Sequence, residues 1–255
     1  QIDGLGIDGH LIYLRGSHLN IKGKWRFDPK IIKQSLLIGV PAGMNHFLLA
    51  ANLLITCRVI SIYGTAALAS IGIGFRILQS IYIPVIAVAS AMAAIVGQNF
   101  GARNLSRITG TLGRAWLVCM LFMIGCTAVC LLVPKFLIGI FSGNADVIYY
   151  GVAYLRIFSI GFVMVGTIMV ASSAFQGLGK TYPSLVGALV DNALFAGLVF
   201  TLPVYFSWGI QAVWWIKLAT AAAETAVVAV WLKHELAKVR SRFNIVHLPA
   251  GLSYN

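Results

Sequence analysis

Residues 66–97 read AALASIGIGFRILQSIYIPVIAVASAMAAIVG, and Arg76 is the only charged side chain in this stretch. A helix needs about 20 consecutive apolar residues to cross the hydrocarbon core of a bilayer, so the stretch is long enough to span it. Its apolar residues follow one another without the alternation of apolar and polar positions that marks a strand of a membrane β-barrel. The stretch therefore predicts a membrane-spanning helix.

Five further apolar segments share these properties, at residues 35–60, 110–133, 147–175, 183–206 and 209–233. Over all 255 residues, 59% are hydrophobic, 10% are charged and the mean hydropathy is +0.88. A soluble domain carries about 25% charged residues, because its surface faces water. We therefore expect an all-α membrane protein with a six-transmembrane-helix bundle in residues 35–235. A basic segment, residues 1–34, precedes the bundle and a tail, residues 236–255, follows it.

Lys and Arg are distributed unevenly between the two sides of the predicted bundle. Fourteen of the 19 lie in residues 1–34, 98–114, 176–182 and 233–255. Because successive spans cross the membrane in opposite directions, these four segments fall on the same side. Lys135 is the only one in the connections of the opposite side. Cytoplasmic loops carry the excess of basic residues, so both ends of the chain are expected in the cytoplasm. This distribution accounts for the net charge of +12, so the charge does not indicate nucleic-acid binding. Proteins that bind nucleic acid gather their basic residues on one folded face.

The sequence indicates neither a metal site nor an enzyme. Its four cysteines lie inside apolar segments without CxxC spacing, which predicts no zinc site and no disulfide framework. Serine-nucleophile, paired-aspartate and HExxH motifs are absent from the predicted spans. His46 is the only histidine in a span, where a packing role is the simpler interpretation. We therefore expect a protein without catalytic residues, cofactor or metal.

Six charged side chains lie inside the predicted spans: Arg58, Arg76, Arg156, Asp191, Lys217 and Glu224. Each costs about 2.5–3.5 kcal/mol at the centre of a transmembrane helix, so such groups usually face a cavity or a partner. Arg58 lies near a helix end, where its side chain can reach the interface. The others leave two interpretations open. They pair with one another, for example Lys217 with Asp191 or Glu224, or they line a hydrated cavity.

Polar residues at helical spacing accompany these charges on four spans. They are Asn45, Asn52 and Thr56; Arg76, Gln79, Ser80 and Ser90; Arg156, Ser159 and Thr167; and Lys217, Thr220 and Glu224. Residues three, four or seven apart share one face of a helix. The pattern predicts an internal cavity, and its candidate lining residues are Asn45, Asn52, Arg76, Gln79, Arg156, Thr167 and Lys217.

Five short segments resemble the multidrug and toxic compound extrusion (MATE) family. In order they are GVPAG (39–43), GTAALA (64–69), VGQNFGARN (96–104), YLRI (154–157) and FQGLGKT (175–181). The third is the most specific, and its motif residues are Gly97, Gln98, Asn99, Gly101 and Ala102. The resemblance extends from about residue 35 to residue 235.

The resemblance implies twelve spans in two six-helix lobes that face each other across a central cavity. It also implies export of organic cations or amphipathic compounds in exchange for H⁺ or Na⁺ by alternating access. This chain is similar to the second lobe, with residues 1–34 as the basic linker between lobes. Since Gln1 is not an initiator methionine, we expect the chain to begin partway through a longer protein. The expected partners are the first lobe, the lipid bilayer and a small organic cation or amphipath, and the expected location is the plasma membrane, which is the inner membrane in a bacterium.

Two positions depart from one branch of the family. Some members carry a cation-binding Glu eight residues after the proline of the first span, where this chain has Leu49. They also carry an Asp in the fourth span, where this chain reads Val165–Thr167. In another branch of the family the coupling acid belongs to the first lobe, which is one possibility here. Alternatively, Asp191 and Glu224 are the candidates in this chain for binding the coupling ion.

Two other transport functions remain open. A lipid-linked glycan flippase of the same superfamily would use a cationic cavity, which Arg76, Arg156 and Lys217 could supply. The membrane subunit of an ATP-driven transporter is less consistent with the sequence. Its cytoplasmic loops would need an acidic motif to dock the nucleotide-binding partner, and residues 98–109 and 176–182 contain no acid.

Overall fold

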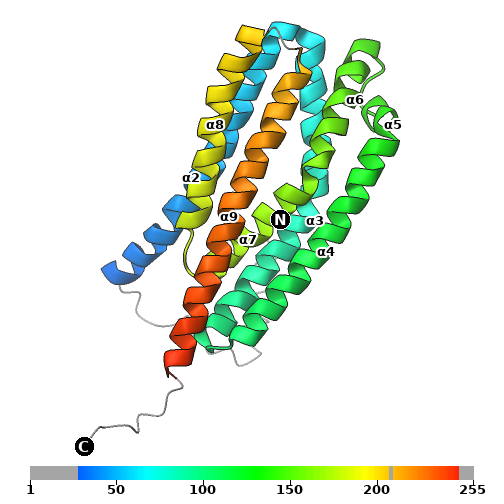
Figure 1. The fold of residues 1–255 in the computed structure, drawn as a ribbon. Helices are drawn as coiled ribbons and strands as arrows, with labels where there is room; N and C mark the ends of the chain where they lie inside the picture. The colour runs from blue at the N-terminus through cyan, green and yellow to red at the C-terminus, as the bar shows by residue number, and fades with distance from the viewer. Residues whose placement is uncertain (1–27, 207–208, 247–255) are drawn as a thin grey trace, which may run out of the picture. The chain divides into compact units, whose positions relative to one another are not determined.

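The computed structural model describes residues 28–206 and 209–246 (Figure 1). Within these ranges the chain is helical and contains no strand, which confirms the predicted all-α fold. The helices are α2 (Pro29–Ile60), the short 3₁₀-helix η1 (Ser61–Tyr63), α3 (Thr65–Gly101), α4 (Leu105–Leu132), α5 (Pro134–Gly139), α6 (Ala145–Ile160), α7 (Phe162–Gly177), α8 (Tyr182–Phe206) and α9 (Gln211–Val246).

The chain divides into two units, residues 1–36 and residues 37–255. The second unit holds the helical bundle from residue 37 onward. Residues 1–27 of the predicted linker and 247–255 of the predicted tail lie outside the described residues, so the predicted boundaries at residues 34 and 235 stay predictions.

Six segments of the described chain are able to cross a membrane by length and composition. Five are continuous, namely Pro29–Tyr63 (α2 with η1), Thr65–Gly101, Leu105–Leu132, Tyr182–Thr201 and Gln211–Phe243. The sixth is the pair α6 and α7, whose axes differ by 53°.

The predicted fourth span, residues 147–175, is therefore broken rather than continuous. The break lies at Gly161, whose N–H donates to the carbonyl oxygen of Phe158 at 3.0 Å. This i to i−3 bond tightens the last turn of α6 in the manner of a 3₁₀-helix and lets the axis change direction. A Cβ at Gly161 would lie 2.9 Å from Leu218 Cδ1, so the break also brings this glycine close to α9.

Helix α9 runs beyond residue 233, the predicted end of the last span. Its additional turns carry buried Glu235, Val239 and Phe243 at intervals of four residues. Lys238 and Arg240, on either side of Val239, are exposed. This stripe packs on the bundle, where the rings of Phe100 and Phe243 lie 5.9 Å apart. A search for long apolar runs misses these turns because half of their surface is charged.

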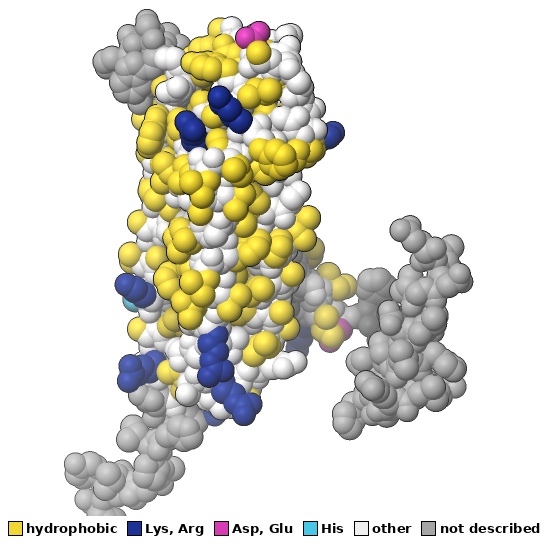
Figure 2. Space-filling model, turned by 90° about the vertical axis from the view of Figure 1, so that its right-hand side faces the viewer, with side chains coloured by type: hydrophobic (Ala, Val, Ile, Leu, Met, Phe, Trp, Pro, Cys, Tyr) yellow, Lys and Arg dark blue, Asp and Glu magenta, His cyan; other side chains and the backbone are white. Residues whose placement is uncertain are grey.

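The surface of the bundle is apolar around its middle. Figure 2 shows a band of hydrophobic side chains between the two ends, with Lys and Arg near both ends of this face. On α4, the exposed residues include Leu117, Leu121, Ile124 and Leu132. Exposed apolar area costs about 25 cal/mol per Å² in water, whereas it costs nothing against lipid. The surface is that of a membrane protein.

Candidate functional site

Polar side chains of α2, α8 and α9 form a cluster inside the bundle, which we call the α8–α9 cluster: Asn45, Asn52, Asp191, Asn192, Lys217 and Glu224. At its centre, the Nζ of Lys217 lies 2.5 Å from Oδ2 of Asp191. The exposed fractions of the two side chains are 20% and 6%. Helices α8 and α9 pack along each other, so both charges leave water and each becomes the other's partner. The ammonium also lies 5.2 Å from the ring centre of Phe195, one turn after Asp191 on α8.

Helix α2 adds two asparagines to this cluster. The amide of Asn52 donates to Asp191 Oδ2 and to Asn192 Oδ1, each at 3.4 Å, and Asn45 donates to the hydroxyl of Ser184 at 3.4 Å. The pairs Asn45–Ser184 and Asn52–Asp191 have the same separation of 139 residues. Helices α2 and α8 therefore run in the same direction, as the first and fifth of six alternately crossing spans must.

Glu224 extends the cluster by two turns along α9. Its side chain faces Gly187 on α8, where an added Cβ would lie 3.5 Å from Cγ and 3.8 Å from Oε1 of Glu224. Asp191 and Lys217 are the charged groups that act on it. Among the described residues, no hydrogen bond or ion pair joins its carboxylate. The charges of Asp191 and Lys217 cancel, so the ionised carboxylate of Glu224 leaves the cluster with one negative charge.

The structure places the other candidate lining residues elsewhere. Arg76 and Gln79 on α3 and Arg156 on α6 are exposed. Thr167 on α7 faces α4, where it accepts a hydrogen bond from Trp116 Nε1 at 3.2 Å. The structure thus brings Asn45, Asn52, Asp191, Lys217 and Glu224 together and leaves these four residues outside the cluster. Their role in a transport pathway stays a prediction.

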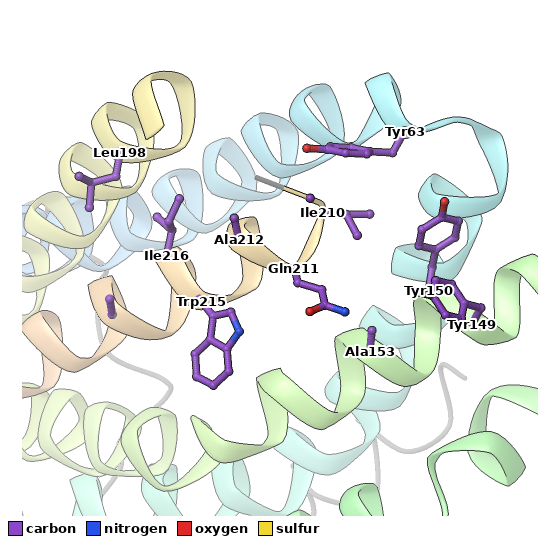
Figure 3. Close-up of a pocket in the computed structure, with 12 residues that line it drawn as sticks. Tyr63, Tyr149, Tyr150, Ala153, Leu198, Ile210, Gln211, Ala212, Trp215 and Ile216 are labelled. Carbon is purple, nitrogen blue, oxygen red and sulfur yellow. The ribbon is translucent and has the colours of Figure 1, made fainter. Parts of the chain in front are cut away.

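An open cavity of about 810 Å³ lies beside the start of α9 (Figure 3). The described residues that line it carry no formal charge, and they are Tyr63, Tyr149, Tyr150, Ala153, Leu198, Gly209, Ile210, Gln211, Ala212, Trp215, Ile216 and Ala219. Figure 3 shows the amide of Gln211 between α9 and α6, with the indole of Trp215 on the same side of α9.

Sequence reasoning missed this cavity. Its signal is the pairs Tyr149–Tyr150 and Trp214–Trp215 near the ends of two predicted spans. Tyr and Trp are common at membrane interfaces, so aromatic pairs at span ends do not by themselves indicate a cavity. Only the packing of α6 beside α9 shows that the two ends share a hollow.

Two of the family-motif segments, VGQNFGARN (96–104) and FQGLGKT (175–181), meet at the opposite end of the bundle. Gly97, Gln98, Asn99 and Gly101 are the last turn of α3 rather than a loop, and Ala102 N–H closes that turn on Gln98 O at 3.0 Å. Gly97 approaches Gly177, since a Cβ added at Gly97 would lie 3.3 Å from Gly177 O. The loop after α7 carries Lys180, whose ammonium bonds to the buried carboxylate of Glu235 on α9. These contacts give the motif a packing role.

Comparison with known proteins shows which proteins this chain is similar to. The MatE family model matches residues 41–202. The probable multidrug resistance protein NorM of Thermotoga maritima is 22% identical over 216 residues, which are 83% of this chain and 46% of that protein. The probable multidrug resistance protein YpnP of Bacillus subtilis is 26% identical over 168 residues, 66% of this chain and 37% of that protein. The chain spans about half the length, or less, of these curated relatives.

Solved structures match along nearly the whole chain. A MOP superfamily transporter from Pyrococcus furiosus has a TM-score of 0.84 and 19% identity, covering 94% of this chain and 54% of that one. An outward-facing multidrug resistance MATE family transporter has a TM-score of 0.84 and 18% identity with the same coverage. The fold is therefore a lobe of a larger MATE fold. With a family model that matches residues 41–202, the chain belongs to the MatE family.

Proposed function

We propose that this chain is one lobe of a secondary antiporter that exports organic cations or amphipathic compounds in exchange for H⁺ or Na⁺ by alternating access. The observation that carries the proposal is the aromatic, uncharged cavity of about 810 Å³ at one end of the bundle. Ligand sites for drug-sized molecules typically measure about 300–1,000 Å³ and are lined mainly by apolar and aromatic side chains. The names of the relatives, which refer to multidrug resistance, support the same function.

The chemistry of the cavity suits a cation with an apolar body. The faces of Tyr and Trp rings attract cations by about 0.5–2 kcal/mol per contact. Tyr149, Tyr150 and Trp215 supply such faces, and Gln211 adds one amide that can orient a polar group. The anionic headgroup of a lipid-linked glycan would instead need basic side chains in the lining of the cavity. Since Arg76 and Arg156 are not among the lining residues and Lys217 is paired with Asp191, no observation favours the glycan flippase.

Replacing Trp215 with Ala is expected to weaken the binding of the fluorescent cation ethidium about five- to tenfold, because one desolvated ring face is lost. Binding is measured by fluorescence anisotropy on the complete transporter in detergent. Trp215→Phe should keep most of the affinity, because it keeps an aromatic face. Trp231→Ala, on the same helix but outside the cavity, is the matched control. An unchanged Kd in Trp215→Ala would exclude this cavity as the substrate site.

The proposal includes an orientation, with both ends of the chain in the cytoplasm of a cell whose plasma membrane the lobe crosses. A cysteine at exposed Gly143, between α5 and α6, is then expected to react with a membrane-impermeant maleimide on intact cells. A cysteine at exposed Ser106, at the start of α4, is expected to react only after the membrane is opened. Both are introduced after the native cysteines of the complete transporter, including the four in this chain, are replaced. The reverse labelling pattern would contradict the orientation.

A further inference from the structure

We propose that Glu224, with Asp191 beside it, forms the proton-binding site that couples this lobe to its driving ion. The inference rests on the proposed antiport and names its coupling site. The starting observation is the charge of the α8–α9 cluster. Asp191 and Lys217 neutralise each other at 2.5 Å, whereas no ion pair joins Glu224 among the described residues. A charge held away from water is normally paired, so the cluster needs one further positive charge.

The second observation is an unpaired carboxylate oxygen on Asp191, one turn along α8 from the Gly187 that Glu224 faces. Asp191 is 5% exposed, and its Oδ1 is buried without a hydrogen-bond partner in the described chain. Oδ2 of the same carboxylate holds Lys217 and accepts from Asn52. A buried carboxylate oxygen without a donor costs about 1–3 kcal/mol, so it indicates a proton or cation that binds here during the working cycle. Gly187, one turn before Asp191, leaves the room on α8 that the Glu224 side chain occupies.

The remaining charges around Glu224 leave the proton as the best-fitting cation. On α8, the charged side chain that acts on it is Asp191, and on α9 it is Lys217. Helix α7, which also packs against α9, contains no ionisable residue. Arg156 on α6 and the basic residues Arg107 and Arg114 of α4 are exposed. A metal cation would need several oxygen ligands, and Lys217 already occupies Oδ2 of Asp191. A proton on Glu224 forms a neutral carboxyl group and needs no further ligand.

Helix α9 links this site to the substrate cavity. Its residues Gln211, Trp215 and Ala219 line the cavity, and Lys217 and Glu224 of the same helix join the cluster. A shift of α9 on substrate binding therefore changes the surroundings of Glu224. In the exchange, the Glu224 carboxylate takes a proton from one side of the membrane and returns it to water on the other side, and no other bond is made or broken.

The test compares Glu224→Gln with wild type in vesicles that contain the complete transporter. The amide has the shape of the protonated acid but cannot release a proton. We expect ethidium movement driven by a pH gradient to fall about tenfold or more. Exchange of ethidium against ethidium, which needs no proton step, should remain near the wild-type rate. Asp146→Asn, an exposed carboxylate on α6, is the matched control and should leave both rates unchanged.

A second measurement does not depend on transport. Binding of ethidium to the wild-type protein in weakly buffered detergent is expected to release protons, and Glu224→Gln should release none. Retained response to the pH gradient in Glu224→Gln, or a response to Na⁺ instead of H⁺ in the wild type, would overturn the inference. If the wild type exchanges no ethidium under any condition, the proposed function itself fails, which is a different outcome.

Discussion

The Asp191→Asn variant is expected to lose about 3 kcal/mol of folding stability, the lower end of the cost of breaking a buried ion pair. The substitution removes the carboxylate that pairs with Lys217, whose side chain is only 20% exposed, and leaves the ammonium against the ring of Phe195. No ion pair joins Lys217 to Glu224 in the described chain, so Glu224 does not take the place of Asp191. An asparagine accepts hydrogen bonds but carries no charge, so it cannot replace the carboxylate. Unfolding of the protein in detergent, followed by temperature or denaturant, measures the loss.

The double variant Asp191→Asn with Lys217→Met separates charge from shape. Removing both charges takes away the unpaired ammonium, so most of the lost stability is expected to return. Asp146→Asn, which changes an exposed carboxylate in the same way, should stay within about 0.5 kcal/mol of wild type. If Asp191→Asn is as stable as wild type, or if the double variant is less stable than the single one, the ion pair does not hold α8 and α9 as described.

The Gly177→Ala variant is expected to lose about 1–3 kcal/mol, the usual cost of overpacking a close contact. A Cβ at this position would lie 2.6 Å from the carbonyl oxygen of Ala93 and 2.9 Å from Cβ and Cγ1 of Val96. One of these atoms belongs to the backbone of α3, so a rotamer change cannot relieve the clash. The ends of α3 and α7 that meet at Gly177 must move apart, and the same unfolding measurement reports the cost.

Gly110→Ala is the matched control for this variant. Gly110 lies in α4, and an added Cβ there would meet no atom within 4 Å. Alanine in an open helical position stabilises by about 0.5–1 kcal/mol relative to glycine. The two substitutions are therefore expected to have opposite signs. Equal effects would show that helix propensity, not the contact between α3 and α7, governs stability at Gly177.

The sequence predicts the number and type of spans because membrane insertion demands long apolar runs, and residues 66–97 meet that demand without any tertiary information. It does not predict the break at Gly161. Glycine is common in transmembrane helices, so Gly161 alone does not indicate a break. The structure shows it by the 53° angle between α6 and α7 and by the bond from Gly161 N–H to Phe158 O. The sequence also does not predict the last turns of α9. Glu235 is buried there because Lys180, in the loop between α7 and α8, forms an ion pair with it.

The candidate site was partly predictable for a related reason. Charges inside spans are costly, so Asp191, Lys217 and Glu224 stand out in the sequence, and the structure brings them together. Helical spacing groups Arg76 with Gln79 on one face but does not tell which way that face points, and in this lobe both side chains are exposed. The cavity at Trp215 and Tyr150 depends on two distant segments meeting, which no local pattern records.

Because we propose that this lobe belongs to an antiporter, the decisive measurement follows both fluxes in the same vesicles. The complete transporter is reconstituted, ethidium is enclosed, and its exit is recorded together with internal pH under an imposed proton gradient. We expect ethidium to leave against its own gradient while protons enter, and a protonophore to stop the net movement. Ethidium movement that is the same with and without a proton or Na⁺ gradient would contradict antiport.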